Sequence, residues 1–362
     1  MKKYQEYQTR NQTKKRAIVS YILDRIIGLF IKSKPVKIKK IKKILIIRND
    51  HIGDVILCSQ IYREIKRKFP DAKITAMIPK SSLALLKKNP HVDKIIPFGM
   101  FWRSPSFKSF RNYIKICKRI KKEKFDFGID IRASFWNILF FLWMPGIKNR
   151  ASYYNITGGN PFLTHPIKYE KIEHTVKFDM GLVAKALNFK VKNYWPEIVT
   201  DKEDEQKVKS FLKKHNLRKY ICICPGASFD EKRWSLKKVD EIIKWFNKKY
   251  PKTKILLIGG LDDEEIIDNL LNENPKCMKL INYNLRLLSL LFKKSKLVMA
   301  NDGGPLHLAW VSNADVIALE GPINLTTIGP LKKSRILVGK NKRINSIKIS
   351  EVKKEIKKIL KK

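Results

Sequence analysis

The sequence predicts an α/β protein made of two facing, doubly wound Rossmann-like domains preceded by a basic extension. Short apolar runs, such as Lys43–Arg48 and Tyr220–Cys224, have the length and continuity of strands buried in a parallel sheet. Stretches with apolar residues at helical spacing alternate with these runs, which is typical of helices covering both faces of such a sheet. The alternation starts afresh after the Pro-containing stretch Lys190–Thr200. We therefore expect an extension at residues 1–42, one domain at 43–195 and a second at 196–362.

Composition narrows the class of protein. The chain has 362 residues, of which 44% are hydrophobic, and this is enough for two well-formed cores. Its net charge of +44 predicts attraction to polyanions, so nucleic acid, an anionic membrane face and an acidic substrate are the candidate partners. The five cysteines lack metal-ligand spacing, and no small-residue cleavage site follows the first apolar segment. We therefore expect a cytoplasmic protein without a signal peptide.

The basic extension contains one amphipathic segment, Ala17–Ile31. Its apolar stripe consists of Ile18, Ile22, Ile26 and Phe30, which recur every four residues, with Val19, Leu23 and Ile27 beside them. The segment is too short, and with Asp24 and Arg25 at its middle too charged, to cross a bilayer. A basic amphipathic helix suits an anionic membrane surface, whereas the alternative is a helix packed on the domain that follows. The pattern leaves both possibilities open.

The first domain is expected to begin with a strand and to alternate regularly. Its expected strands are Lys43–Arg48, Asp71–Ile78, Lys94–Phe98 and Phe125–Ile131. Its expected helices are Gly53–Lys68, Ser81–Lys88, Phe107–Lys122, Ser134–Trp143 and His174–Leu187. Ala151–Tyr169 contains two adjacent glycines and two prolines, so it is expected to be irregular.

The second domain repeats this alternation. Its expected strands are Tyr220–Cys224, Lys254–Ile258, Lys296–Ala300 and Asp315–Leu319. Its expected helices are Leu236–Lys249, Asp263–Asn272, Leu285–Lys293 and the terminal Ser350–Lys361. In folds of this kind, ligands bind beyond the carboxyl ends of the strands. The turns that follow the strands are therefore where functional residues should be sought.

The turn Arg48–Asp54 follows the first expected strand. It lacks the G-x-G-x-x-G pattern, so it is not a dinucleotide-binding turn. It offers instead a histidine, His51, and carboxylates. Asp54 lies on the first turn of a helix, where it could take a proton from a hydroxyl group, or could simply complement the helix dipole. His51 and Arg48 are candidates for contacts on the acceptor side of a cleft.

Two further turns belong to the second domain. Pro225–Trp234 combines a Gly/Ser turn with Lys232 and Arg233, which suits a phosphate contact, although a solvated loop would have the same composition. Ala300–Ala309 sets Asp302 and two glycines between a strand and a helix. The helix N-terminus there could receive a diphosphate, with the carboxylate beside it for sugar hydroxyls; the alternative is a tight turn capped by Asp302.

Two details of these turns bear on the chemistry. Pro305 suits the first turn of the helix that follows Gly304. His307 could donate to a phosphate or could be a half-buried histidine with its needs met by the protein. No D-x-D sequence occurs anywhere in the chain, so the usual carboxylate pair for a metal-held nucleotide sugar is missing. We expect catalysis without a metal ion or other cofactor.

Together the three turns resemble the heptosyltransferase family of bacterial glycosyltransferases, which have the GT-B fold. The resemblance is carried by ILIIRNDHIGDVIL near the start, by PGASFDEKRW followed by LLIGG, and by ANDGGPLHLAW followed by VIALEGP. Their order and spacing match over residues 43–330. The basic extension and residues 98–170 do not contribute to the match.

The resemblance implies an inverting glycosyltransferase. It would move a sugar, a heptose in this family, from a nucleotide diphosphate donor such as ADP-heptose to a lipopolysaccharide core or related glycolipid. The matching positions imply that Asp54 is the catalytic base, that Lys232 contacts the donor phosphate and that Ser228 also binds the donor. They also imply that Asp302 contacts the donor sugar, with the amides of Gly303 and Gly304 on the phosphates. The family usually has Ser or Thr where Gly303 stands, so one hydroxyl contact to the donor is absent here.

The sequence also leads to an expected localisation and leaves two alternative functions. With the extension, the resemblance implies an enzyme of the cytoplasm that is peripheral on the inner membrane, where an anionic glycolipid acceptor would lie. One alternative is a sugar-nucleotide-processing enzyme of the epimerase type. The other is a basic nucleic-acid-binding protein, but no helix-turn-helix, RNP or zinc pattern is present and the acidic turns would be unexplained. We therefore do not expect nucleic acid as a partner.

Overall fold

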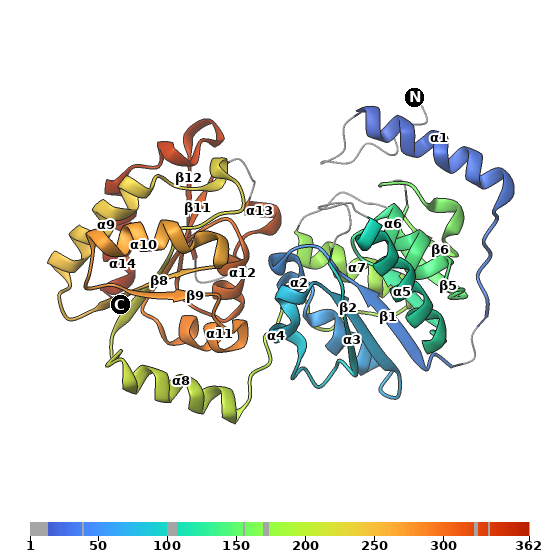
Figure 1. Ribbon diagram of the computed structural model, residues 1–362, viewed down its shortest axis with the longest axis horizontal. Helices are drawn as coiled ribbons and strands as arrows, with labels where there is room; N and C mark the ends of the chain where they lie inside the picture. The colour runs from blue at the N-terminus through green and yellow to red at the C-terminus, as the bar shows by residue number, and fades with distance from the viewer. Residues whose placement is uncertain are drawn as a thin grey trace. The chain divides into compact units, whose positions relative to one another are not determined.

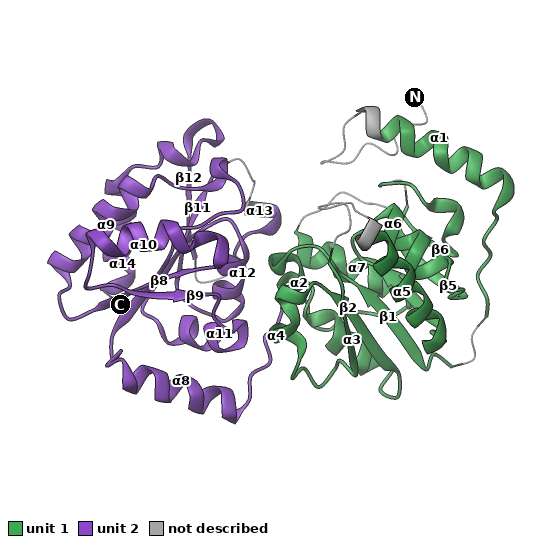
Figure 2. Ribbon diagram, viewed as in Figure 1, with its two compact units in different colours: residues 1–194 green, residues 195–362 purple. Residues whose placement is uncertain are grey.

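A computed structural model describes residues 14–37, 40–99, 107–154, 156–168, 174–321, 325–331 and 334–361. The chain divides into two compact units, Met1–Tyr194 and Trp195–Lys362 (Figure 2). Each unit holds a six-stranded sheet, and all the strand pairs described in both sheets are parallel. The prediction of two doubly wound Rossmann-like domains is confirmed.

The sheet of unit 1 has the strand order β3-β2-β1-β4-β5-β6, and its paired strands β1 and β2 lie side by side in Figure 1. The strands are β1 (Lys43–Ile47), β2 (Lys73–Ile78), β3 (Lys94–Pro97), β4 (Phe127–Asp130), β5 (Asn149–Tyr153) and β6 (His165–Ile167). The apolar side chains of β1 are fully buried, because helices cover both faces of a parallel sheet. One apolar cluster of the unit joins the central strands to α5 and to the helical segment after α6.

The helices of unit 1 are α1 (Lys14–Phe30), α2 (Ile52–Leu57), α3 (Gln60–Lys68), α4 (Leu83–Leu86), α5 (Phe107–Glu123), α6 (Phe135–Asn137) and α7 (Thr175–Ala186). A π-helical segment, Ile138–Trp143, continues α6. The prediction of a single helix over Gly53–Lys68 was wrong, because the helix is interrupted at Cys58 and Ser59, which separate α2 from α3. The Ser59 hydroxyl donates to the carbonyl of Ile56 at 2.8 Å, and such back-bonding bends helices.

The expectation that Ala151–Tyr169 is irregular was wrong in part, because β5 ends in this stretch, at Tyr153, and all of β6 lies in it. β5 is fully buried, whereas β6 is the edge strand of the sheet. Pro166 is tolerated in β6 because an edge strand needs ladder hydrogen bonds on only one side. The glycines and prolines that suggested a loop belong to the connection between the two strands and to this edge.

Unit 2 has the strand order β12-β11-β10-β7-β8-β9. The strands are β7 (Tyr220–Cys224), β8 (Lys254–Gly259), β9 (Met278–Ile281), β10 (Val298–Asn301), β11 (Val316–Glu320) and β12 (Ser334–Val338). The helices are α8 (Lys202–Lys214), α9 (Leu236–Lys249), α10 (Glu264–Glu273), α11 (Leu285–Lys294), α12 (Gly304–Val311), α13 (Leu325–Ile328) and α14 (Ile349–Leu360). One apolar cluster joins the central strands to α9, α10 and α14.

The amphipathic segment of the extension is α1, and it packs on unit 1 by a different face from its apolar stripe. Ala17, Ser20 and Asp24 are buried, and Ile27 packs against the cluster that contains Ile138. The outer face carries exposed Val19, Ile22, Leu23, Ile26, Leu29 and Phe30. Thus α1 does pack on the domain, while most of the predicted stripe stays outside. Among the residues that the structure describes, no helix is both long enough and apolar enough to span a bilayer.

Candidate active site

In doubly wound sheets, ligands bind beyond the carboxyl ends of the strands, at the switch point where the strand order reverses. In unit 1 this point lies between β1 and β4, which are paired neighbours. The loop from Arg48 to His51 follows β1 directly, and α2 begins at Ile52, so Asp54 lies on the first turn of that helix. The first sequence motif therefore occupies the switch point of its sheet.

Arg48 is the centre of this loop, and it is buried, with only 6% of its surface exposed. Its Nη2 donates to Oδ1 of Asp54 at 2.9 Å. Its Nε lies 3.2 Å from Oδ1 of Asp50, in an ion pair without hydrogen-bond alignment. Its Nη1 donates to Oδ1 of Asp179, on α7, at 3.5 Å. One guanidinium thus contacts three carboxylates: Asp50 in the same loop, Asp54 on the helix that follows it, and Asp179 on α7.

Burial and charge act against each other in this cluster. Burial alone would lower the pKa of Arg48, but the three carboxylates raise it well above its usual value, so the cation is permanent. Burial raises the pKa of Asp179 to about 7, with Arg48 opposing the shift. Burial also raises the pKa of Asp50, again against Arg48. Asp50 has a second cation, Arg132, at 3.9 Å.

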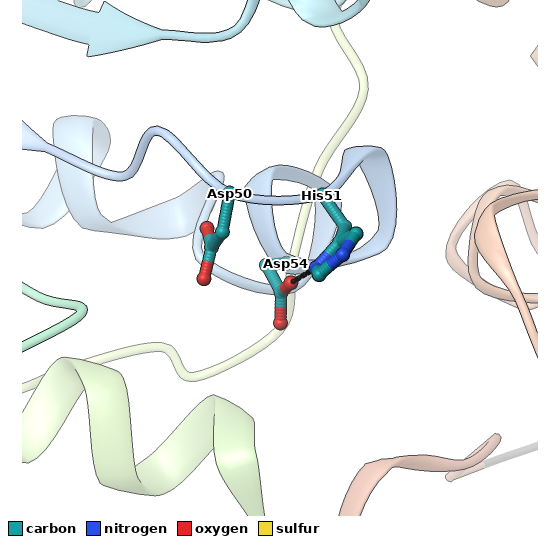
Figure 3. Close-up of side chains that lie close together, drawn as sticks. All are labelled: Asp50, His51 and Asp54. Atoms are coloured by element: carbon teal, nitrogen blue, oxygen red, sulfur yellow. Dashed lines mark hydrogen bonds and ion pairs between the residues drawn. The ribbon is translucent and has the colours of Figure 1, made fainter. Parts of the chain in front are cut away.

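Asp54 is the carboxylate of the group that reaches solvent, with 29% of its side chain exposed. Its Oδ2 lies 3.2 Å from Nδ1 of His51, while Oδ1 is held by Arg48. Figure 3 shows His51 beside Asp54, with Asp50 on the other side. A carboxylate held on both oxygens but open to solvent is suited to accept a proton from a bound hydroxyl group.

Asp50, His51 and Asp54 could in principle be ligands of a metal ion, because their donor atoms lie within 4.8 Å of one another. Arg48 already lies against both carboxylates, and a divalent cation would have to compete with this buried charge. The donor set therefore fits a guanidinium better than an ion. Independence from metal stays a prediction.

Residues that the sequence did not single out complete the switch point of unit 1. The amide of Asn137, on α6, donates to Oδ1 of Asp130 at 3.0 Å and exchanges hydrogen bonds with Asn49. Burial raises the pKa of Asp130, at the end of β4, to about 6. Asp179 could have been noticed as an acidic residue on an otherwise apolar helix face, but nothing near it in the sequence identifies Arg48 as its partner.

In unit 2 the strand order reverses between β7 and β10, and the other two motifs follow these two strands. Asn301, the last residue of β10, ties the two turns together. Its side-chain amide donates to the carbonyls of Pro225 and Gly226 at 2.8 and 3.2 Å, and its Oδ1 accepts from the backbone N–H of Trp234 at 3.3 Å. Asn301 directly precedes Asp302 in the third turn, but the sequence alone gave it no role.

Lys232 and Asp302 meet across these turns, with Nζ 2.8 Å from Oδ2. Asp302 is 5% exposed, and the ammonium also lies 5.9 Å from the centre of the Phe229 ring. Gly303 and Gly304 precede and begin α12, and they are partly exposed, whereas Ser228 is exposed. Pro305 lies in the first turn of α12, as the sequence predicted.

His307 is buried behind Asp302. Its Nδ1 accepts from the indole N–H of Trp310 at 3.4 Å, because an indole can only donate. Its Nε2 lies 3.9 Å from Oδ1 of Asp302. The histidine therefore has protein partners on both sides, and its geometry suits support of Asp302; a direct contact with phosphate stays a prediction.

Comparison with known proteins now decides the family. The sequence profile of Glycosyltransferase family 9 (heptosyltransferase) matches residues 113–359, which is more than half of the chain. The chain belongs to this family. It is therefore a glycosyltransferase, and the resemblance stated from the motifs is confirmed. Family membership does not favour the epimerase or nucleic-acid-binding alternatives.

Several named heptosyltransferases are similar to this chain over most of their length. Lipopolysaccharide heptosyltransferase 2 of Salmonella typhimurium is 24% identical over 82% of this chain and 87% of its own. The structure of E. coli ADP-heptose lps heptosyltransferase II superposes with a TM-score of 0.74 at 21% identity, covering 88% of this chain and 98% of that one. E. coli heptosyltransferase WaaC with ADP-2-deoxy-2-fluoro heptose gives 0.69 at 17% identity, covering 87% and 99%. These structural likenesses support the fold over the part of the chain that they cover.

Proposed function

We propose that this enzyme transfers a heptose from ADP-heptose to the core of a lipopolysaccharide or lipooligosaccharide. The observation that carries the proposal is that both switch points hold the residues which such a transfer requires. Unit 1 has the solvent-reaching carboxylate Asp54, and unit 2 has Lys232 beside the N-terminus of α12. Family membership and the names of the similar proteins support this choice of donor and acceptor.

The proposed reaction is a single displacement with inversion. The acceptor hydroxyl attacks the anomeric carbon of the heptose, and the bond between that carbon and the diphosphate oxygen breaks. Asp54 takes the proton of the attacking hydroxyl, and the nucleoside diphosphate leaves with the bonding electrons. His51, which is exposed beside Asp54, would contact the acceptor. No covalent enzyme intermediate and no metal ion is needed.

We assign the donor contacts to unit 2. Lys232 and the backbone N–H groups of Gly303 and Gly304 would receive the diphosphate, because the N-terminus of α12 carries partial positive charge. Lys232 would exchange its contact with Asp302 for the phosphate, which frees Asp302 for hydroxyls of the sugar. Ser228 would add a hydroxyl contact, and His307 would hold Asp302 in place.

The substitution Asp54→Asn tests this assignment. Loss of a general base typically lowers the rate by ~10²–10⁴-fold, whereas binding of ADP-heptose should be unchanged. Transfer to a delipidated core oligosaccharide would be followed by ADP release, and donor binding by calorimetry. Turnover close to that of the natural protein would remove Asp54 from the mechanism. Failure of ADP-heptose to bind the natural protein, with binding of another nucleotide sugar, would overturn the donor.

We further propose that the enzyme works at the cytoplasmic face of the inner membrane, docked there by α1. The support is that the face of α1 that packs on unit 1 is not the face that carries most of its apolar side chains. Asp24 fixes the packed face by accepting from the backbone N–H groups of Gly159 and Asn160 at 2.6 and 3.3 Å. The opposite face is exposed, with Ile22 at 48%, Ile26 at 52% and Phe30 at 83%.

The charges beside this face favour an anionic bilayer over another protein. Arg25, Lys32 and Lys34 are exposed on and just after α1, and Asp24, its acidic residue, is buried on the inner side. The apolar side chains would enter the headgroup boundary, and each cation near an anionic surface would add about 1 kcal/mol. An acceptor that is itself an anionic glycolipid would be held in the same surface.

The double substitution Ile22→Asp with Ile26→Asp tests the docking. It should abolish co-sedimentation with vesicles containing anionic lipid while leaving transfer to a soluble acceptor unchanged. The matched control is Ile336→Asp with Val338→Asp, which adds the same charge at two exposed apolar residues of β12. Equal vesicle binding by both variants would assign attachment to the general surface charge. Dissociation of a dimer by the α1 variant alone would assign the face to a second copy of the chain.

A further inference from the structure

The carboxylates around Arg48 differ in how many other partners they have. Asp50 has Arg132 as a second cation, at 3.9 Å, and Asp54 has His51. Asp179 is 1% exposed, and its contact with a cation is the one with Arg48. Its Oδ2 makes no hydrogen bond among the residues that the structure describes. Among the residues that the structure describes, Arg48 is therefore the cation that Asp179 contacts, and it lies 131 residues away in the sequence.

The arrangement separates a supporting side from a reacting side. Asp179 and the buried part of the Arg48 side chain lie behind, closed to solvent. Asp54 lies in front, on a helix of only six residues, and is partly open to solvent. A side chain that is partly open to solvent can adopt several rotamers, and a short helix constrains it little. The position of the Asp54 carboxylate therefore depends on what holds its Oδ1. That contact is the 2.9 Å bond from Nη2 of Arg48.

We propose that Arg48 and Asp179 are positioning residues that hold the Asp54 carboxylate in its reactive orientation. This inference rests on the proposed function, because it takes Asp54 to be the base. Asp179 fixes one end of the guanidinium plane, and the opposite nitrogen then presents its N–H to Asp54. The planar fork of arginine can bond in two directions at once, which the single ammonium of lysine does not reproduce. Arg48 would thus act through Asp54 and not as a contact to the acceptor.

Kinetic constants distinguish positioning from a merely structural role. Misplacement of a reacting group by about 1 Å can cost 10²-fold in rate. We expect Arg48→Lys and Asp179→Leu to lower kcat by about 10–100-fold at pH 8, with KM for ADP-heptose changed less than twofold. Arg48→Met should lower kcat further than Arg48→Lys, because the lysine restores the charge without the geometry.

A matched control is available in the same unit. Glu64, on α3, is 1% exposed and is paired with Arg63 and Arg67, at 3.5 and 3.3 Å. Glu64→Met therefore removes a buried carboxylate from arginine partners that do not touch Asp54. This variant should lower the thermal midpoint, as Asp179→Leu should, but leave kcat unchanged. Circular dichroism checks that each variant is folded.

The outcomes separate this inference from the proposed function. If Asp54→Asn is inactive while folded Arg48→Lys and Asp179→Leu keep the natural kcat, the positioning role is wrong and the general base stands. If Asp54→Asn is active, the proposed base is wrong. Equal losses of kcat in Asp179→Leu and Glu64→Met would show that stability alone sets the rate, and would also overturn the inference.

Discussion

Replacing Asp179 by asparagine should change how the stability of the enzyme depends on pH. Burial raises the pKa of Asp179 to about 7, whereas an unfolded chain has about 3.9. Between these values the folded state holds a proton that the unfolded state has lost, so this residue makes the folded state less stable as the pH rises. Its penalty is absent below pH ~4 and complete above pH ~7. Asparagine does not titrate and carries no such penalty.

The magnitude follows from the shift. About three pKa units at 1.36 kcal/mol each give up to ~4 kcal/mol between the two ends of the window. For a unit of this size, 1 kcal/mol corresponds to about 2–4 °C in the unfolding midpoint. The midpoint of Asp179→Asn relative to the natural protein should therefore rise by roughly 8–16 °C from pH 4 to pH 8. Asp130, whose pKa is not shifted by Asp179, is common to both proteins and cancels in the difference.

Differential scanning calorimetry at pH steps between 4 and 8 would measure this difference. The control is Asp71→Asn, which removes an exposed carboxylate whose pKa is lowered by Lys40, so that its contribution is nearly constant above pH ~5. Parallel curves for Asp179→Asn and the natural protein would refute the reasoning. They would mean that Asp179 is ionised in the folded state throughout, with Arg48 outweighing burial.

Four further predictions concern unit 2 and the independence from metal. Lys232→Ala should weaken ADP binding by roughly 1.5–3 kcal/mol, the range for a charged hydrogen bond. Asp302→Ala should weaken the binding of ADP-heptose more than the binding of ADP. If calorimetry shows that each variant loses the same affinity for both ligands, the assigned roles of Lys232 and Asp302 are wrong. Transfer should continue in the presence of a chelator, and strict dependence on added magnesium would contradict this. Gly226→Ala should destabilise unit 2 by about 1–3 kcal/mol in urea unfolding, because its Cβ would lie 2.0 Å from Oδ1 of Asp263; a change below 0.5 kcal/mol would mean that the turn moves freely.

The parts of the fold that could be predicted from the sequence are those with continuous burial. β1 and β7 are buried on both faces, so their apolar runs are unbroken. The edge strands β9 and β12 are half-exposed, and their mixed composition gave no signal. α8 was missed for a similar reason, because it is mostly charged and only Asp204 and Val208 are buried.

The candidate site divides in the same way. Asp54, Lys232 and Asp302 lie in, or at the end of, the connections that follow strands, so local sequence was enough to select them. Arg48 was predicted to contact the acceptor, because a cation in such a turn resembles a ligand contact. The sequence could not show that Asp179, on α7, would contact the guanidinium of Arg48. Partners distant in the chain are set by tertiary packing, and no local pattern records them.

Salt should separate the two kinds of charge in this protein. The net charge of +44 is spread over an exposed surface, where ionic strength of 0.15 M screens interactions beyond about 8 Å. Vesicle binding through Arg25, Lys32 and the rest of the surface should therefore weaken strongly between 50 and roughly 300 mM salt. The ion pairs of Arg48 are buried and largely shielded from that screening. Transfer to a soluble acceptor at saturating donor should then keep its kcat over the same range. A kcat that falls in step with vesicle binding would mean that surface charge, and not the buried cluster, controls the reacting carboxylate.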